Sequence, residues 1–361
     1  MDWNPRPAEE LWELISKNDS PSILKGILTE ELFHKLKDKK TSFGGTLAHC
    51  MSSGCLHFRK NAGIYASDPE AYSVFADIFT EVIRRYHRVE ILNHPEPYYG
   101  SEEQIRALQN IDPDGETVIS TRVRVGRSHA KYPFIPVCSL QNLVDMEKET
   151  ACALNSLTGE LAGKYYSLAD LDNATKEQLI TDHFLYRHDD ETLRDAGLYK
   201  FLDKGRGIFF NEAKTFICWV NEEDHVRLIS METGGDIASV YLRLVKAIRE
   251  MEKRLTFAKK EGYGFLTFCS TNLGTTLRAS VLMAIPNVCK QPNFLDVLNK
   301  YNIQARGTWG VGSANVDDIY DLSNKRRLGL TEFAAVTEML NGVRAIKEWE
   351  EELVRINKTD K

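Results

Sequence analysis

The 361-residue chain lacks the common signatures of a phosphate-binding loop. Residues 38–42 hold a lysine pair and two hydroxyl side chains but none of the glycines of such a loop, and no GxGxxG pattern is present. In those loops the backbone amides contact the phosphates. If a nucleotide binds to this chain, its phosphates must therefore be held by side chains.

Cysteine spacing, charge and hydropathy exclude further classes. The seven cysteines are scattered and show no paired CxxC spacing, which argues for reduced thiols and against a disulfide framework or a zinc site. A formal net charge of −6 gives no basic field for nucleic acid. No apolar run approaches the roughly 20 residues of a membrane span, and the first residues lack the pattern of a signal peptide. We expect a soluble, cytoplasmic protein without nucleic-acid or membrane partners.

The first 95 residues are predicted to be helical. Segments 8–38 and 71–88 carry apolar residues at helical spacing. Two prolines and a glycine in segment 94–100 then interrupt any helix. We therefore expect an all-α domain over residues 1–95 and a second domain over residues 96–361.

The second domain is predicted to mix strands with long helices. Four segments have strand patterns, and the last three predict an antiparallel meander: 117–125, 207–210, 215–220 and 226–231. Long amphipathic helices are predicted at 140–157, 237–259 and 331–356. This combination is typical of the α+β class.

Arginines recur in the strand segments. Alternation places Arg122 and Arg124 on one face of a strand and Val123 and Val125 on the other. Three more arginines occur later in the chain: Arg227, Arg278 and Arg306. Guanidinium groups match phosphate oxygens through paired hydrogen bonds. If these side chains converge, they form a polyphosphate clamp; the alternative is a solvated strand face.

A thiol and an acidic run are candidates for the rest of a site. Cys269 follows an apolar run, 264–268, that predicts a buried strand, and precedes a loop with a glycine. It is either a packed core residue or a thiolate held by neighbouring positive charge. The run 222–224, Glu-Glu-Asp, lies between two predicted strands. It is either a charged hairpin turn or a source of one carboxylate that points toward a cationic substrate.

These segments together resemble the phosphagen kinases, the ATP:guanidino phosphotransferases, and among them the arginine kinases. The resemblance covers nearly the whole chain and is strongest at residues 120–124, 182–185, 205–208, 219–225, 269–278 and 323–329. It implies a small all-α domain and a large domain with an eight-stranded antiparallel sheet flanked by helices. It also implies reversible transfer of the ATP γ-phosphoryl group to the guanidino group of L-arginine by a monomer. Mg²⁺ is expected on the nucleotide and water, with no protein ligand.

The resemblance implies roles for individual residues. For the nucleotide, with ATP or ADP bound, these are Ser120, Thr121, Arg122, Val123, Arg124, His183, Arg227, Arg278, Ala279, Ser280, Val281, Leu282, Arg306, Gly307, Thr308, Trp309, Gly310 and Val311. For the guanidino substrate they are Asn61, Ala62, Gly63, Ile64, Tyr65, Glu223 and Cys269. Residues 61–65 match the specificity segment of the small domain. Catalysis is expected from Glu223, Cys269, Arg227, Arg278 and Arg306. In this scheme Glu223 orients the guanidinium and takes its proton, while the arginines neutralise the phosphates.

The chain departs from the arginine kinase pattern in three places. Val311 stands where a glutamate is usual, within an irregular segment, 307–318, that is predicted to be a mobile lid. Ser270 replaces a proline, and residues 88–89 replace two glycines. Two alternatives therefore stay open. One is a kinase for taurocyamine or another guanidine; the other is a nucleotide-binding homologue with weak or lost catalysis.

A further departure concerns two charged positions. The family often pairs an acidic residue before the specificity segment with an arginine in the large domain. Those positions hold Arg59 and Glu191 here. The sequence therefore predicts an ion pair between the domains with its charges exchanged, worth about 0–1 kcal/mol if exposed.

Overall fold

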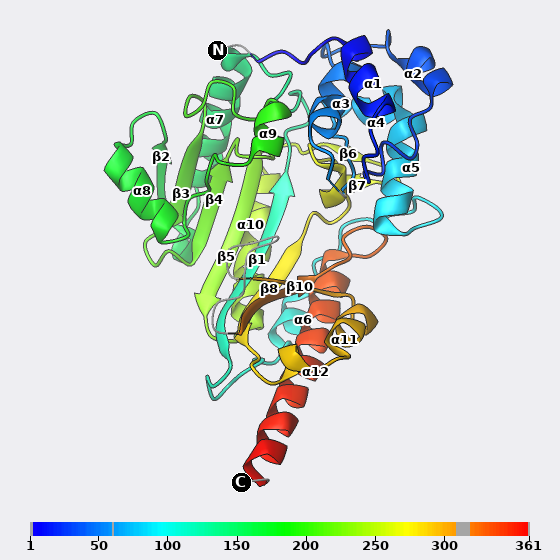
Figure 1. Cartoon of the computed structure of the whole chain (residues 1–361). Coiled ribbons are helices and arrows are strands. Elements are labelled where there is room, and N and C mark those ends of the chain that lie inside the picture. The colour runs from blue at the N-terminus through cyan, green and yellow to red at the C-terminus, as the bar shows by residue number, and fades with distance from the viewer. Residues whose placement is uncertain (1–2, 60, 308–317, 360–361) are drawn as a thin grey trace.

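The computed structural model describes residues 3–59, 61–307 and 318–359 (Figure 1). The N-terminal part is helical, as predicted. Its helices are α1 (Ala8–Ser16), α2 (Glu30–Leu36), α3 (Leu47–Leu56), α4 (Ala71–Val74) and α5 (Ala76–His87). Residues 17–29 form turns, because Asn18, Ser20 and Pro21 favour turns over helix. No helix in the described ranges is long and apolar enough to span a membrane.

An eight-stranded antiparallel sheet forms the centre of the rest of the molecule. Its strands, in chain order, are β1 (Val118–Arg127), β2 (Gly163–Ser167), β3 (Gly207–Asn211), β4 (Phe216–Val220), β5 (Val226–Thr233), β8 (Arg278–Ala284), β9 (Ile303–Arg306) and β10 (Ile319–Asn324). Their spatial order is β2-β3-β4-β5-β1-β8-β10-β9. The predicted meander is confirmed as β3-β4-β5. The long strand β1 pairs with β5 and β8 near the middle of the sheet.

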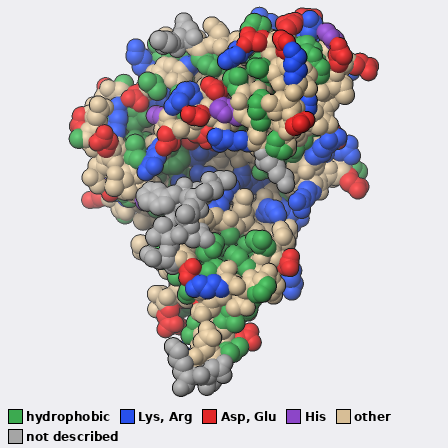
Figure 2. Space-filling model, in the orientation of Figure 1, with side chains coloured by type: hydrophobic (Ala, Val, Ile, Leu, Met, Phe, Trp, Pro, Cys, Tyr) green, Lys and Arg blue, Asp and Glu red, His purple; other side chains and the backbone are tan. Residues whose placement is uncertain are grey.

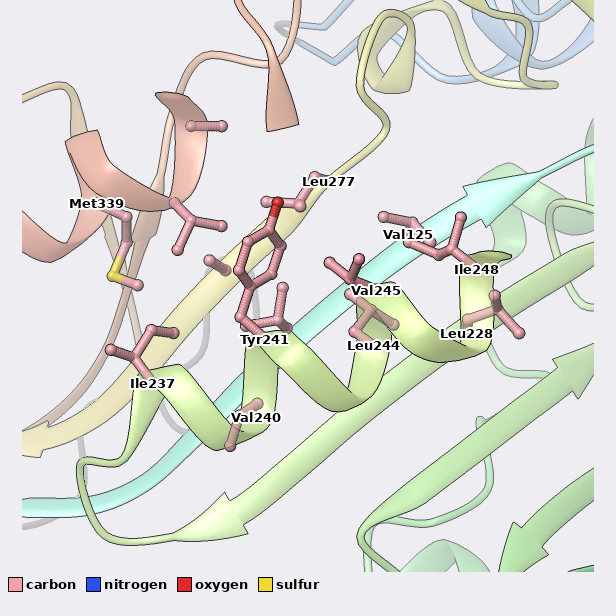
Figure 3. Close-up of a cluster of buried hydrophobic side chains, with 14 of the residues drawn as sticks. Val125, Leu228, Ile237, Val240, Tyr241, Leu244, Val245, Ile248, Leu277 and Met339 are labelled. Carbon is pink, nitrogen blue, oxygen red and sulfur yellow. The ribbon is translucent and has the colours of Figure 1, made fainter. Parts of the chain in front are cut away.

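Helices cover one face of this sheet. The covering helices are α7 (Leu140–Asn155), α10 (Ile237–Glu252) and α12 (Glu332–Thr359), with the short α6 (Glu102–Arg106) against α10. Figure 3 shows apolar side chains of α10 packed against Val125 and Leu228 of the sheet. Val123 is buried in the same core. The predicted alternation is therefore confirmed, and it leaves Arg122 and Arg124 on the opposite face.

Shorter elements complete the architecture at the edges. They are α8 (Asn173–Thr181), α9 (Glu191–Asp195), α11 (Phe294–Lys300), η1 (Gly159–Leu161), η2 (Ser270–Asn272) and η3 (Val288–Lys290). A separate two-stranded sheet joins β6 (Lys259–Lys260) to β7 (Gly264–Phe265). The termini lie at opposite ends of the molecule, with α12 extending away from the sheet (Figure 1).

The strand predicted over residues 264–268 is only partly correct. Strand structure ends at Phe265, and Leu266 and Phe268 leave the sheet to join the core of the N-terminal helices. Tyr72 of α4 donates a hydrogen bond to the Thr267 carbonyl at 2.7 Å. Apolar character predicted the burial correctly, but the residues that bury this run are helical. The chain leading to Cys269 is therefore held by the N-terminal helices.

The predicted ion pair between Arg59 and Glu191 is wrong. Both residues are described, both are exposed, and no ion pair joins them. A different pair connects the same two regions, since His57 Nε2 lies 2.7 Å from Asp195 Oδ2. Ser53 also donates to the Thr192 carbonyl at 2.7 Å. Helix α3 is thus linked to α9 by the His57–Asp195 pair and by Ser53, and not by Arg59 and Glu191.

Candidate functional site

Arginines from four strands, the neighbours β5, β1 and β8 and, beyond β10, β9, point to the same face of the sheet. Arg124 on β1 lies directly opposite Arg278 on β8. Arg227 on β5 lies opposite Gly126. Gly126 follows Arg124 by two residues and is therefore on the same face of β1. On the far side, Arg306 of β9 is paired with Asp321 of β10. Directly opposed residues of antiparallel strands share a face, so the register gathers these guanidinium groups.

Several of the gathered side chains line a pocket that is open to solvent. Figure 2 shows basic side chains in a hollow near the middle of the molecule. The lining residues are Arg124, Gly126, Asp224, Arg227, Asn272, Thr276, Arg278 and Arg327. Four of these eight carry a guanidinium group. The pocket is therefore built for a ligand with several negative charges.

The guanidinium groups perturb one another. Burial and the neighbouring Arg278 lower the pKa of Arg122 to about 10. The same two causes lower the pKa of Arg306 to about 10. For Arg124, burial followed by the charges of Arg227 and Arg122 lowers the pKa well below its ordinary value. An anion placed among these groups would relieve their mutual repulsion.

Several donors in this cluster have no acceptor. The Nε atoms of Arg122, Arg278 and Arg306 are buried, and none has a hydrogen-bond partner among the residues described. A buried donor without an acceptor is uncommon in folded proteins and costs about 1–3 kcal/mol. Three such donors in one arginine cluster, with Arg278 lining the pocket, indicate acceptors supplied from outside the chain, as phosphate oxygens would supply them.

Three carboxylates hold Arg227 in place. Arg227 Nη1 lies 2.6 Å from Glu222, and its Nη2 lies 3.1 Å from Glu223 and 3.4 Å from Asp224. Burial opposes the charged form of Arg227, yet these three carboxylates raise its pKa. The acidic run is therefore not a solvated hairpin turn. All three side chains turn inward to the same guanidinium.

The carboxylates differ in environment. Burial, with Glu223 nearby, raises the pKa of Asp224 to about 7. Burial also raises the pKa of Glu222. Glu223 is half-buried and accepts a hydrogen bond from Asn272 Nδ2 at 3.0 Å. Its carboxylate is thus fixed between Arg227 and Asn272 at the edge of the pocket.

Cys269 lies next to the predicted specificity segment. Tyr65 is paired with Cys269 in an isolated antiparallel bridge. The Tyr65 ring stacks on Phe268 with centroids 4.6 Å apart. The Cys269 sulfur lies 3.0 Å from the Thr271 hydroxyl. Segment 61–65, although far away in the sequence, is therefore brought to the thiol.

Without a bound guanidino group, the surroundings of Cys269 do not favour the predicted thiolate. Burial, with the Glu223 carboxylate nearby, raises the pKa of the thiol to about 12. A low pKa would have required a neighbouring cation to outweigh burial. Within the chain alone, burial and Glu223 thus favour the thiol over the thiolate.

Other predicted residues contribute from different positions. Within the specificity segment, Ala62, Gly63 and Ile64 are buried, while Asn61 and Tyr65 are half-exposed. The side chains that share the face of Val123, opposite to the arginines, are those of Thr121, Ala279 and Val281. Ser120, Ser280 and Leu282 share the face of Arg122.

His183 is exposed after the end of α8 and has a φ of 61°. The next carbonyl, that of Phe184, accepts a hydrogen bond from Trp219 Nε1 at 2.7 Å. The guanidinium of Arg122 lies 5.6 Å from the centre of the Trp219 ring. His183 is thus connected to the arginine cluster through two neighbours. Gly307 is buried at the end of β9, and Thr308, Trp309, Gly310 and Val311, with most of the predicted lid, lie outside the described residues.

Arg327 and Asn272 are among the lining residues that were not assigned roles from the sequence. Arg327 donates hydrogen bonds to Asn272 Oδ1 and, at 3.4 Å, to the Thr271 carbonyl. Burial and the charge of Arg278 lower its pKa. Arg326, its neighbour in sequence, is instead exposed and paired with Glu338 on α12. The available signal was the match at residues 323–329, which does not distinguish two adjacent arginines.

Comparisons with known proteins agree with this geometry. The model of the ATP:guanido phosphotransferase C-terminal catalytic domain matches residues 145–353, and that of the N-terminal domain matches residues 18–84. An arginine kinase of Haliotis madaka is 53% identical over 97% of this chain and 98% of its own length. An arginine kinase of Turbo cornutus is 53% identical over 93% of this chain and 94% of its own length.

Solved structures show the same similarity. A duplicated taurocyamine kinase from Schistosoma mansoni, with bound transition state analog components, matches with a TM-score of 0.94 and 42% identity over 99% of this chain. This chain spans 50% of that protein's length. A lombricine kinase matches with a TM-score of 0.86 and 33% identity over 93% of both chains. Since two domain models match in order and relatives align over nearly its full length, the protein belongs to the ATP:guanido phosphotransferase family.

Proposed function

We propose that the protein transfers the γ-phosphoryl group of ATP reversibly to the guanidino group of L-arginine, giving phosphoarginine and ADP. The observation that carries this proposal is the convergence of guanidinium groups from β1, β5, β8 and β9 beside Glu223 and Cys269. Arginine is favoured over other guanidines because the relatives named arginine kinase are 45–53% identical to this chain. The taurocyamine and lombricine kinase structures are 42% and 33% identical.

The arginines would bind the phosphates and neutralise charge during transfer. Phosphoryl transfer needs little covalent help from a protein, so alignment and electrostatic stabilisation supply most of the catalysis. The unpartnered Nε atoms of Arg122, Arg278 and Arg306 would donate to phosphate oxygens. Ser120, Ser280 and Leu282 form the adjacent part of the same sheet face. His183 is proposed near the base and ribose, on the side of Arg122.

Glu223 and Cys269 would bind the substrate guanidinium. Glu223 is fixed by Arg227 and Asn272, so its carboxylate can orient a planar N–H group and take a proton from it. A guanidinium arriving beside Cys269 would introduce the cation that the thiol lacks and favour its thiolate. Tyr65 and Asn61 are the half-exposed members of the specificity segment. They are proposed to contact the rest of the substrate.

The remaining assignments are also proposals. Mg²⁺ would accompany ATP, bound by phosphate oxygens and water. Within the described ranges, no group of three or more His, Cys, Asp or Glu side chains could hold a metal ion. Residues 1–95 would form the specificity domain and 96–361 the catalytic domain, which agrees with separate family models over 18–84 and 145–353. We propose a cytoplasmic monomer, in keeping with seven free thiols.

A substrate panel tests this function. Purified protein with ATP and Mg²⁺ is offered arginine, taurocyamine, creatine, glycocyamine and lombricine, and ADP release is measured. The expected result is highest kcat/KM on arginine. Preference for taurocyamine or lombricine would contradict the substrate assignment, and ADP binding without turnover on any guanidine would identify an inactive homologue.

A further inference from the structure

The third arginine of β1, Arg127, does not face the pocket. Alternation along β1 places it on the core face with Val123 and Val125, whereas Arg122 and Arg124 face the ligand side. Its side chain is fully buried. Burying a guanidinium costs free energy unless its donors are satisfied. The position of Arg127 therefore depends on specific partners.

Those partners lie in the segment that leads into β8. Arg127 Nη1 donates to Thr276 Oγ1 at 2.8 Å and to the Thr275 carbonyl at 3.3 Å. Its Nη2 donates to the Tyr99 hydroxyl at 3.0 Å. The guanidinium carbon lies 3.4 Å from the centre of the Phe265 ring. Arg127 thus connects strand β1 to the loop between Cys269 and Arg278.

Thr276 has an unusual backbone conformation for its residue type. Its φ is 57°, in the left-handed region that β-branched residues rarely adopt. Such strain persists only where the surroundings hold it, and it is concentrated at functional sites. Thr276 itself lines the pocket, two residues before Arg278.

The Thr276 hydroxyl makes every hydrogen bond available to it. It donates to the Gly126 carbonyl at 2.7 Å. It accepts from the Gly126 amide at 3.1 Å and from Arg127 Nη1 at 2.8 Å. A hydroxyl has one donor and two acceptor positions, and all three are used. The side chain is therefore locked to β1 by a saturated set of contacts.

We propose that Arg127 and the Thr276 hydroxyl form a clamp that positions Arg278 for phosphoryl transfer. The clamp holds Thr276 in its strained conformation. Because Thr276 lies two residues before Arg278, this also fixes the start of β8, where Arg278 lies opposite Arg124. The backbone of Arg327 supports the same turn, because its carbonyl accepts from the Thr275 amide at 2.9 Å. Arg127 and Thr276 are thus positioning residues; neither needs to touch the substrate.

The inference rests on the proposed kinase activity and makes a specific kinetic prediction. A displacement of about 1 Å at a positioned group can cost about 10²-fold in rate. Ground-state binding of the nucleotide also uses Arg122, Arg124 and Arg227, which come from other strands. Loss of the clamp should therefore lower kcat far more than it raises the KM for ATP.

The test compares substitutions at Thr276. Thr276→Val removes the hydroxyl and keeps the shape and β-branching, and it should lower kcat at least about tenfold while the KM for ATP changes less than about threefold. Thr276→Ser retains the hydroxyl and should recover most of the lost kcat. Thr117→Val is the matched control, since the Thr117 hydroxyl is buried and has no hydrogen-bond partner among the described residues. The control should behave as wild type.

Arg127→Lys supplies an independent measurement. It keeps the charge but loses the planar guanidinium, whose two Nη groups donate to Thr275, Thr276 and Tyr99. The value of kcat should therefore fall as in Thr276→Val. Circular dichroism establishes that each variant is folded at the assay temperature. A kcat within about twofold of wild type in either folded variant overturns the clamp, and so does an equal change in kcat and KM. Absence of turnover in the wild-type enzyme would instead contradict the proposed function.

Discussion

At the scale of single residues, opposite charges keep the arginine cluster in order. Arg278 Nη2 lies 2.6 Å from Asp321 Oδ2, and Arg227 is shared by three carboxylates. Each arginine therefore keeps a fixed direction while part of its guanidinium remains available. Pre-oriented charge stabilises a transition state without reorganisation at the moment of reaction.

Arg278→Ala should reduce kcat by about 10²–10³-fold, because it removes a charge that is proposed to stabilise the transferred phosphoryl group. The substitution also leaves Asp321 without its partner, so a small loss of stability is expected. Steady-state kinetics with arginine and ATP measure the effect. Arg106→Ala is the matched control, since Arg106 is exposed on α6 and paired with Glu102. A kcat close to wild type in Arg278→Ala would contradict its proposed role.

Asp224 should give the protein a pH-dependent stability. Burial raises its pKa from 3.8 in an exposed chain to about 7 in the folded protein. The folded state then holds a proton that the unfolded state has lost. Stability from this group is complete below pH 3.8 and is lost as pH rises through about 7. Urea unfolding between pH 5 and 8, a window set by this shift, should show a shallower decline for Asp224→Asn than for wild type. Equal slopes would show that this carboxyl is not the titrating group.

At the scale of secondary structure, helix α3 determines where the specificity segment lies. A Cβ built on Gly54 would lie 1.8 Å from the Gly63 carbonyl oxygen. The helix therefore meets the segment by backbone contact, which only glycine allows at this position. The segment continues to Tyr65, which is paired with Cys269.

Gly54→Ala should displace the specificity segment. Overpacking of this kind costs about 1–3 kcal/mol. We expect a higher KM for the guanidino substrate with little change in ADP affinity, because the arginine cluster lies on the sheet. Gly26→Ala is the matched control, since a Cβ there would lie 3.5 Å from its nearest neighbour, an ordinary contact. Parallel losses of arginine and ADP binding would argue against a local effect.

The sequence predicted elements better than contacts. Period-two alternation correctly assigned the faces of residues 122–125, because strand geometry alone determines that pattern. The apolar run at 266–268 was correctly expected to be buried, but the helices that bury it are far away in sequence, as the 195-residue separation of Tyr72 and Thr267 shows. The pKa of Cys269 could not be predicted, since it depends on burial and on Glu223. Arg327 was missed because two adjacent arginines show no periodicity.

At the scale of the whole molecule, the arginine cluster is a positive charge in the middle of the fold that its carboxylate partners neutralise only in part. Arg122, Arg124 and Arg306 have lowered pKa values because burial and like charges oppose ionisation. The folded protein therefore carries an electrostatic cost that an anionic ligand removes. Stability and ligand binding are coupled through this cost.

MgADP should raise the melting temperature of the protein. A ligand at 100 times its dissociation constant stabilises a fold by about 2.7 kcal/mol. Adenosine, which lacks phosphates, should produce little shift at the same concentration, and higher salt should reduce the shift with MgADP. Differential scanning fluorimetry measures all three conditions. A shift with adenosine equal to that with MgADP would mean that the arginines do not bind the phosphates.

The helices of residues 1–95 and the chain around Cys269 share one apolar core. Leu266, Phe268, Leu273 and Leu328 belong to that core together with residues of α1 to α5. The two halves are therefore not interchangeable modules. A chimera that takes the N-terminal helices of a relative, in order to take over its substrate preference, must also take that relative's side chains at the four core positions around Cys269. A change of substrate preference in this molecule is therefore limited by the packing of this shared core, although the core itself does not contact the substrate.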